Sequence, residues 1–158
     1  MGLTVASQTA FAGHTNPVLE AQLDGRNEVR TDAKDNRLVG YPDGSGEIYV
    51  FGIDNDPSRQ TLCYVLNVEK IGELDQAPGA GRAAHIHRGA PGENGPVVAN
   101  LAWPQDGQAG DCLDQTEPGK FVNGGTVSDI LANPSEYYVN VHNAEYPAGA
   151  LRGQLQAD

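Results

Sequence analysis

The chain has 158 residues, including 20 glycines and 10 prolines, and a formal net charge of −11 at pH 7. This length suits one domain with one hydrophobic core, and so many turn-forming residues leave few segments that could sustain a helix. The negative charge disfavours nucleic acid and anionic membranes as partners. No apolar stretch approaches transmembrane length, so we expect no membrane insertion.

The first residues, 1–17, contain a pattern that resembles a signal-peptidase site. It is the small-x-small sequence Ala10-Phe11-Ala12. A basic start and a full apolar stretch are missing, so we interpret 1–17 as the remnant of a leader or as a disordered N-terminus. Residues 18–158 are then expected to form a single domain, and a leader would fit a secreted or periplasmic protein.

Short apolar runs bounded by turn residues predict an all-β protein made of antiparallel hairpins. The expected strands cover 18–25, 46–55, 60–71, 82–89, 95–102, 137–143 and 149–156. From the second strand onward they are expected to pair in consecutive hairpins. Seven or eight short strands with frequent turns predict an antiparallel β-sandwich or barrel.

The segments between these strands are expected to hold one short helix and two long loops. Residues 126–136 form the helix, with Thr126 or Ser128 as its N-cap. The polar residues 30–45 and the segment 103–120 are interpreted as loops, because they are rich in glycine, proline and acidic residues.

The two cysteines, Cys63 and Cys112, lie about fifty positions apart and not in a C-x-x-C motif. This spacing argues against a thioredoxin-like or zinc-ribbon role. The preferred interpretation is one structural disulfide that closes a long loop, which would place the protein in an oxidising compartment. Two buried thiols are the alternative.

His85 and His87 form an H-x-H motif in an expected strand. Side chains at i and i+2 of a strand share a face, about 6.5–7 Å apart, so two imidazoles can converge on one metal ion at bond lengths of about 2 Å. His142, in a later strand, could supply a third nitrogen. Ligation by imidazole alone suits copper or zinc, whereas magnesium and calcium prefer oxygen. Alternatively, the histidines are structural and each is hydrogen-bonded separately.

Other residues are candidates for supporting roles at such a site. His14, Tyr138 or water could be a fourth ligand, while Glu28 and Asn140 could accept hydrogen bonds from ligand imidazoles. The glycine-rich segment 89–96 lacks the lysine and hydroxyl of a phosphate-binding loop, so we expect a tight turn beside the site.

The segment HIHRGAPGENGPVV resembles the signature of the CHRD domain, a family named after chordin. The segments AQLDGRNEV, GSGEIYVFGID, TLCYVLNVEKI and NPSEYYVNVHNAEYPAGALRGQL are similar to other parts of that family's pattern. The resemblance runs from about residue 18 to residue 156. It implies an immunoglobulin-like, Greek-key β-sandwich and leaves the biochemical role open.

A second resemblance is to the copper site of copper/zinc superoxide dismutases, because HIH, VNVH and GALR follow one another in the same order. It implies that His85, His87 and His142 hold copper and that Arg152 lies near it and guides an anionic substrate. Alternatively, Arg152 pairs with a carboxylate in a strand. No histidine lies between His87 and His142, so the bridging ligand and the zinc cluster have no counterpart.

The sequence therefore predicts an exported mononuclear copper-binding protein with a three-histidine site. Copper held by neutral imidazoles would permit electron transfer, copper handling or superoxide chemistry with a small redox partner or oxidant. No cysteine or methionine is near a histidine motif, which argues against a blue-copper centre. Catalytic turnover and oligomeric state stay open. The alternative is a non-catalytic extracellular interaction module.

Overall fold

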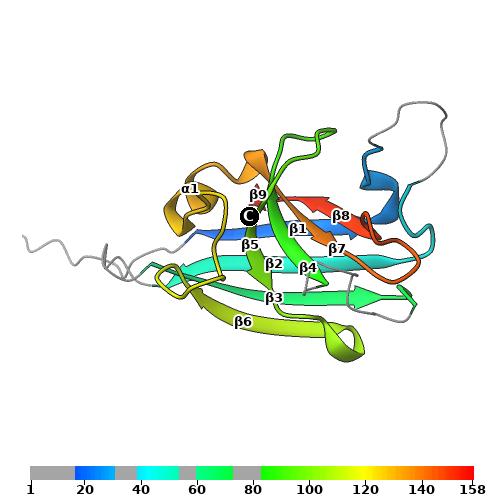
Figure 1. The fold of residues 1–158 in the computed structure, drawn as a ribbon, viewed down its shortest axis with the longest axis horizontal. Coiled ribbons are helices and arrows are strands. Elements are labelled where there is room, and N and C mark those ends of the chain that lie inside the picture. Colours follow the sequence, from blue (N-terminus) through cyan, green and yellow to red (C-terminus); the bar gives the residue numbers. More distant parts are fainter. Residues whose placement is uncertain (1–16, 31–38, 54–59, 73–82) are drawn as a thin grey trace, which may run out of the picture.

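The computed structural model of the chain describes residues 17–30, 39–53, 60–72 and 83–158 (Figure 1). Almost all of the expected leader, including His14, lies outside the described residues, as does the middle of the expected loop 30–45. No helix among the described residues is long and apolar enough to cross a membrane.

The described part of the chain contains nine strands, and the all-β prediction is confirmed. The strands are β1 Val18–Asp24, β2 Ser45–Ile53, β3 Thr61–Glu69, β4 Ala84–Arg88, β5 Val97–Leu101, β6 Gln108–Asp114, β7 Tyr137–Val141, β8 Leu151–Gln154 and β9 Gln156–Ala157. The expected antiparallel pairs β2–β3, β4–β5 and β7–β8 are all present.

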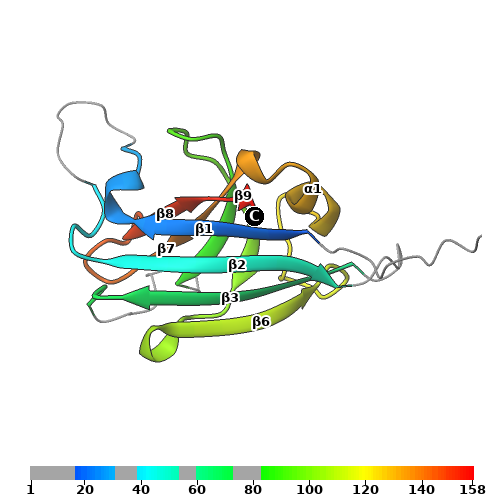
Figure 2. The same ribbon diagram turned by 180° about the vertical axis from the view of Figure 1, so that it is seen from behind.

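The strands form one antiparallel sheet in the order β5-β4-β7-β8-β1-β2-β3-β6, with β9 added beside β1. The sheet curls into a nearly closed barrel, and the β4–β5 hairpin crosses the direction of β1, β2 and β3 (Figures 1 and 2). After the β4–β5 hairpin the chain returns to place β6 beside β3, which is a Greek-key connection. This curvature places the two halves of the sheet around one core.

The core consists of alternate strand residues that point to the inside of the barrel. Ile48, Leu62, Leu66, Ile86 and Val139 are all fully buried, because successive side chains of a strand point to opposite faces. A hydrogen bond also joins the two halves, since the Ala102 backbone N–H donates to the Tyr64 hydroxyl. The side chain of Ile86 therefore turns inward, and those of its two neighbours in the H-x-H motif turn to the opposite face.

The expected helix is α1, Val127–Ala132, which is shorter than the predicted segment. The Thr126 hydroxyl accepts a hydrogen bond from the Asp129 N–H, as expected of an N-cap. Val127 and Ile130 are buried against the core. Residues 134–136 form a separate 3₁₀ turn, η3 Pro134–Glu136, and two more such turns are η1 Gly25–Asn27 and η2 Gln105–Gly107.

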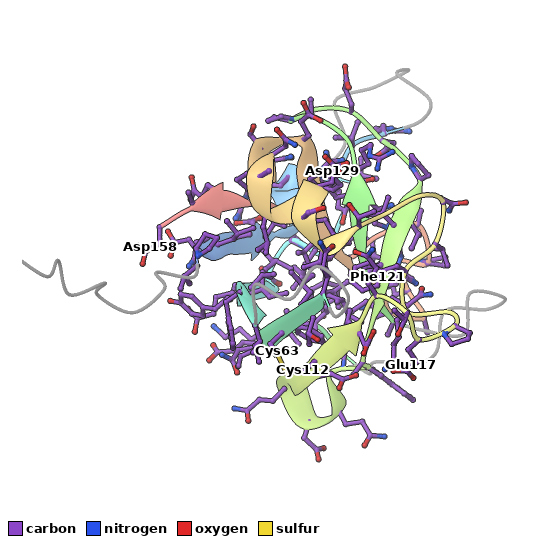
Figure 3. All side chains as sticks on the ribbon, turned by 90° about the vertical axis from the view of Figure 1, so that its left-hand side faces the viewer. Cys63, Cys112, Glu117, Phe121, Asp129 and Asp158 are labelled. Atoms are coloured by element: carbon purple, nitrogen blue, oxygen red, sulfur yellow. A yellow bond between two sulfur atoms is a disulfide. The ribbon has the colours of Figure 1, made fainter. Side chains whose placement is uncertain are left out.

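The prediction of a loop over 103–120 is wrong, because this segment contains β6. Leu113 is the one buried apolar residue that β6 contributes to the core, so the strand lacks the alternating apolar pattern that sequence reasoning depends on. Its conformation is set by pairing with β3, where Cys63 lies directly opposite Cys112. These two cysteines form the expected disulfide (Figure 3).

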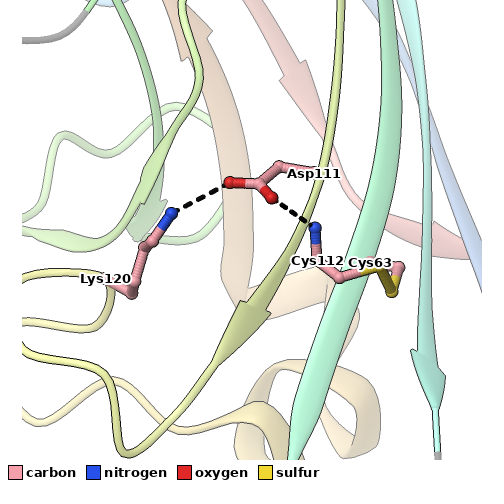
Figure 4. Close-up of a disulfide and its surroundings, with 4 residues drawn as sticks. All are labelled: Cys63, Asp111, Cys112 and Lys120. Atoms are coloured by element: carbon pink, nitrogen blue, oxygen red, sulfur yellow. Dashed lines mark hydrogen bonds and ion pairs between the residues drawn. A yellow bond between two sulfur atoms is a disulfide. The ribbon is translucent and has the colours of Figure 1, made fainter.

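The segment 120–122 fills part of the gap between β5 and β6, the two free edges of the barrel. The Asn100 N–H donates to the Lys120 carbonyl, and the Val122 N–H donates to the Val98 carbonyl, so the segment runs along β5. The Lys120 ammonium lies 2.9 Å from the Asp111 carboxylate on β6, beside the disulfide (Figure 4). The ion pair thus connects the β5 side of the barrel to the β6 side.

Candidate metal centre

His85 and His87 lie side by side on β4, on the face opposite the buried Ile86. Their ring centroids are 5.7 Å apart and the two rings are perpendicular. His85 is 3% exposed and His87 is half-buried, so most of this face of the strand is covered. The alternation of a β-strand therefore produces the shared face that the motif predicts.

His142 joins this pair because β7 is the neighbour of β4 in the sheet. It follows directly after β7, and its N–H continues the pairing by donating to the Ala83 carbonyl. The centroid of its ring lies 5.2 Å from that of His85 and 6.4 Å from that of His87. One ring nitrogen from each histidine lies within 4.8 Å of the other two. The three histidines singled out in the sequence thus form one cluster.

Two of the imidazoles are fixed by backbone carbonyls. His87 Nδ1 lies 2.9 Å from the Gly95 carbonyl oxygen, and His142 Nδ1 lies 3.1 Å from that of Pro147. Because a carbonyl can only accept, each Nδ1 must carry the proton, which leaves Nε2 as the unprotonated nitrogen of the neutral ring. Both Nε2 atoms are buried and have no hydrogen-bond partner among the described residues.

Burial keeps these imidazoles neutral. It lowers the pKa of His87 from 6.5 to about 4, although the hydrogen bond to Gly95 acts in the opposite direction. Burial lowers the pKa of His142 as well. At neutral pH both rings therefore present a lone pair on Nε2, which is the form that binds a metal ion.

The cluster is close to the size of a site for a single metal ion. Two nitrogens bound to one ion by bonds of about 2.0–2.1 Å can be at most about 4 Å apart. One nitrogen from each histidine lies within 4.8 Å of the other two, so the rings would have to move slightly closer together to bind the same ion. Metal-bound imidazoles usually donate their other N–H to an oxygen acceptor, as His87 and His142 do here. No carboxylate or thiolate of the described residues belongs to this cluster.

The ring of Tyr138 separates Arg152 from His87. It stacks on the His87 ring with centroids 4.8 Å apart and an interplanar angle of 13°, and the Arg152 guanidinium carbon lies 3.5 Å from the Tyr138 ring centroid. Arg152 is only 2% exposed and donates to two carbonyls and to the Asn94 side chain. No carboxylate of the described residues is among the hydrogen-bond acceptors of Arg152, although the charge of the nearby Glu28 carboxylate acts on it.

Glu28 and Asn140 bind each other. The Asn140 amide donates to the Glu28 carboxylate at 3.2 Å, and burial raises the pKa of Glu28 from 4.5 to about 7 despite this bond and the nearby charge of Arg152. The acceptors for the two Nδ1–H groups are instead the carbonyls of Gly95 and Pro147, which sequence reasoning missed. Every residue has a backbone carbonyl, so the sequence alone does not identify these acceptors. Of the two, only Gly95 lies in a segment that the sequence had marked, the glycine-rich residues 89–96.

Glu28→Gln is expected to change how the free energy of unfolding depends on pH. The pKa of His87 is lower in the folded protein than in the unfolded chain. The protein therefore loses stability as pH falls from 6.5 towards 4, because the unfolded chain takes up the proton first. The pKa of Glu28 is raised in the folded protein, so the contribution of Glu28 to the free energy of unfolding is lost as pH rises from 4.5 towards 7. In the wild type, the effects of the histidine and of Glu28 on the pH dependence of stability oppose each other. E28Q removes the effect of Glu28 and leaves that of the histidine.

Urea denaturation monitored by circular dichroism between pH 4.5 and 7.5 checks this expectation. As pH rises over this range, the free energy of unfolding of E28Q should increase relative to that of wild type by up to about 3 kcal/mol, because one pKa unit corresponds to about 1.4 kcal/mol. Glu117→Gln is the matched control, because Glu117 is exposed, and it should follow the wild-type profile. Parallel profiles for E28Q and wild type would contradict the raised pKa of Glu28.

The fold and the cluster together define a class: a Greek-key β-barrel domain with three clustered imidazoles, two of them buried and one half-buried, which come from β4 and from the residue that follows β7. The family model of the CHRD domain matches residues 19–155. The chain belongs to the CHRD-domain family, as the resemblance implied. No curated protein and no solved structure matches the chain, so the resemblance to copper/zinc superoxide dismutases rests on the sequence motifs alone.

Proposed function

We propose that the protein is an exported copper-binding protein and that His85, His87 and His142 hold the ion. The observation that carries the proposal is the state of two imidazoles. His87 and His142 are each oriented by a carbonyl on Nδ1, and each leaves Nε2 buried and without a partner among the described residues. A buried nitrogen acceptor with no donor is costly unless something binds it, and a metal ion satisfies both atoms at once.

The donor set favours copper, with zinc as the second metal. Three neutral nitrogens suit both metals, but Cu²⁺ binds a given site more tightly than Zn²⁺. Copper would supply one-electron chemistry at this position, and the partner would be a small redox protein or a small oxidant. The Tyr138 hydroxyl accepts a hydrogen bond from the Gly95 N–H, so we assign the fourth position to water or to His14 in preference to Tyr138.

Two observations support the assignment to the cell exterior. The Cys63–Cys112 disulfide fits an oxidising compartment. Membership of the CHRD-domain family fits an extracellular module. An all-nitrogen site is also compatible with that environment, because it has no thiolate ligand that could be oxidised.

The second candidate is a non-catalytic interaction module in which the histidines are structural. The hydrogen bonds of His87 to Gly95 and of His142 to Pro147 favour it, because each ring ties a strand to a loop. This alternative accounts for the two Nδ1 atoms. It gives no role to the two Nε2 atoms, which have no hydrogen-bond partner in the part of the chain that the structure describes.

Metal analysis of the purified full chain separates the two candidates. The protein is dialysed against equal concentrations of Cu²⁺ and Zn²⁺ with a weak competing chelator, and bound metal is then counted. The proposal predicts one copper per chain and little zinc. Retention of zinc alone would assign the site to zinc, and no stoichiometric retention of either metal would favour the interaction module.

A further inference from the structure

The loop between β4 and β5 contains a tight turn over residues 90–93. The Glu93 N–H donates to the Ala90 carbonyl at 3.0 Å, and Gly92 has a φ of +84°. Proline in the second position and a glycine with positive φ in the third are typical of a type II turn. The expected tight turn beside the site is confirmed, and it directs the chain towards Gly95, whose carbonyl binds His87.

Arg152 binds both ends of this turn. Its guanidinium donates to the Ala90 carbonyl at 3.2 Å and to the Glu93 carbonyl at 2.7 Å, and it reaches the Asn94 side-chain oxygen at 3.1 Å. The Asn94 amide donates in turn to the Val29 carbonyl. A buried cation satisfied by neutral oxygens of a single loop is thus a fixed support for that loop.

Tyr138 acts on the next part of the loop. The Tyr138 hydroxyl accepts a hydrogen bond from the Gly95 N–H at 3.2 Å. The Gly95 carbonyl in turn accepts a hydrogen bond from His87 Nδ1 at 2.9 Å. A Cβ at position 95 would lie 1.7 Å from the Arg88 carbonyl oxygen, so only glycine lets the loop approach β4 this closely. The flat stacking of Tyr138 on His87 adds a second constraint on the imidazole.

We infer that Arg152 and Tyr138 are positioning residues that set the tautomer and orientation of His87 through the loop. Arg152 holds the turn, the turn places Gly95, and the Gly95 carbonyl keeps the proton on His87 Nδ1. Nε2 of His87 then carries the lone pair that faces the other two histidines. The inference rests on the proposed function only for its effect on copper, because the tautomer of His87 is a property of the metal-free protein.

Arg152→Met tests the inference, because it removes the donors and the charge while keeping a long apolar side chain. Arg88→Met is the matched control. Arg88 also lies over a tyrosine ring, that of Tyr137 at 5.7 Å, but its donors bind Tyr137, Gly124 and Asp129 and not the loop. Nitrogen-15 NMR of the metal-free imidazoles distinguishes the two tautomers of His87. Wild type and R88M should show one Nδ1–H tautomer, and R152M should show a mixture.

The copper readout gives a second test on the same variants. R152M should still bind one copper per chain, because the three histidines remain, but its affinity should be about 10–100-fold weaker, as for loss of an outer partner of a ligand. The copper hyperfine splitting in its EPR spectrum should change, and that of R88M should not. If wild type binds no copper, the proposed function fails, while the NMR result still decides the inference.

Tyr138→Phe provides a milder variant in case R152M does not fold. It keeps the stacked ring and removes only the hydroxyl that accepts from the Gly95 N–H. Its His87 tautomer ratio should shift in the same direction as that of R152M, by less. If every folded variant of this pair keeps the wild-type tautomer, Arg152 and Tyr138 do not position His87, and the inference is overturned.

Discussion

His87→Ala is expected to remove stoichiometric copper binding from the protein. The substitution takes away one of three nitrogen donors and opens the buried cluster, since Tyr138 loses the ring that it stacks on. The loss of affinity should exceed the roughly 100-fold that the loss of an outer partner of a ligand can cost. Titration with a copper chelator of known affinity measures the change.

His142→Ala should give the same result, because His142 belongs to the same cluster although it comes from a different part of the chain. His14→Ala is the comparison variant, since it removes the histidine that lies outside the described residues and that the proposal assigns at most to the fourth position. H14A should keep one copper per chain, and a changed EPR spectrum in H14A would identify His14 as the fourth ligand. Retention of copper with wild-type affinity by H87A would refute the three-histidine site.

Removal of the disulfide is expected to have the largest effect on stability. Cys63 and Cys112 are 49 positions apart in the sequence, and for a loop of this length the chain-entropy model gives a stabilisation of about 4 kcal/mol. The bond also joins β6 to β3, and β6 contributes only Leu113 to the apolar core. The double variant Cys63→Ala/Cys112→Ala should therefore lose about 2–5 kcal/mol of unfolding free energy in urea denaturation.

Reduction provides the control for this experiment. Dithiothreitol should destabilise the wild-type protein by a similar amount and leave the double variant unchanged. The variant should still bind one copper, because the disulfide joins β3 and β6, while His85 and His87 belong to β4 and His142 directly follows β7. A double variant within about 1 kcal/mol of wild type would show that the pairing of β6 does not depend on the crosslink.

A strand whose apolar residues alternate can be predicted directly from the sequence. In β3, Leu62, Tyr64, Leu66 and Val68 point inward, and their spacing alone identifies the strand and its buried face. β6 has no such pattern, so its strand conformation depends on β3, whose paired residues lie about forty to fifty positions earlier in the chain. Pairing between distant segments is a tertiary effect, which local propensity cannot predict.

The same division applies to the candidate site. The i, i+2 spacing of His85 and His87 predicted a shared face, and the strand-like context of His142 predicted that it could join them. The Gly95 and Pro147 carbonyls were not predictable, because a backbone acceptor leaves no mark on the side-chain sequence. For Arg152 the residue was identified, but its acceptors are two loop carbonyls and the Asn94 side chain, which neither of the two interpretations of the sequence anticipated.

The most direct test of the three-histidine copper site is pulsed EPR on the Cu²⁺-loaded full chain. Imidazole bound through one ring nitrogen modulates the electron spin echo through its remote nitrogen, so the modulation depth reports the number of bound imidazoles. We predict the modulation of three imidazoles in wild type and a shallower modulation in any copper that H87A retains. A copper signal without imidazole modulation, or with a depth that H87A does not change, would contradict the site formed by His85, His87 and His142.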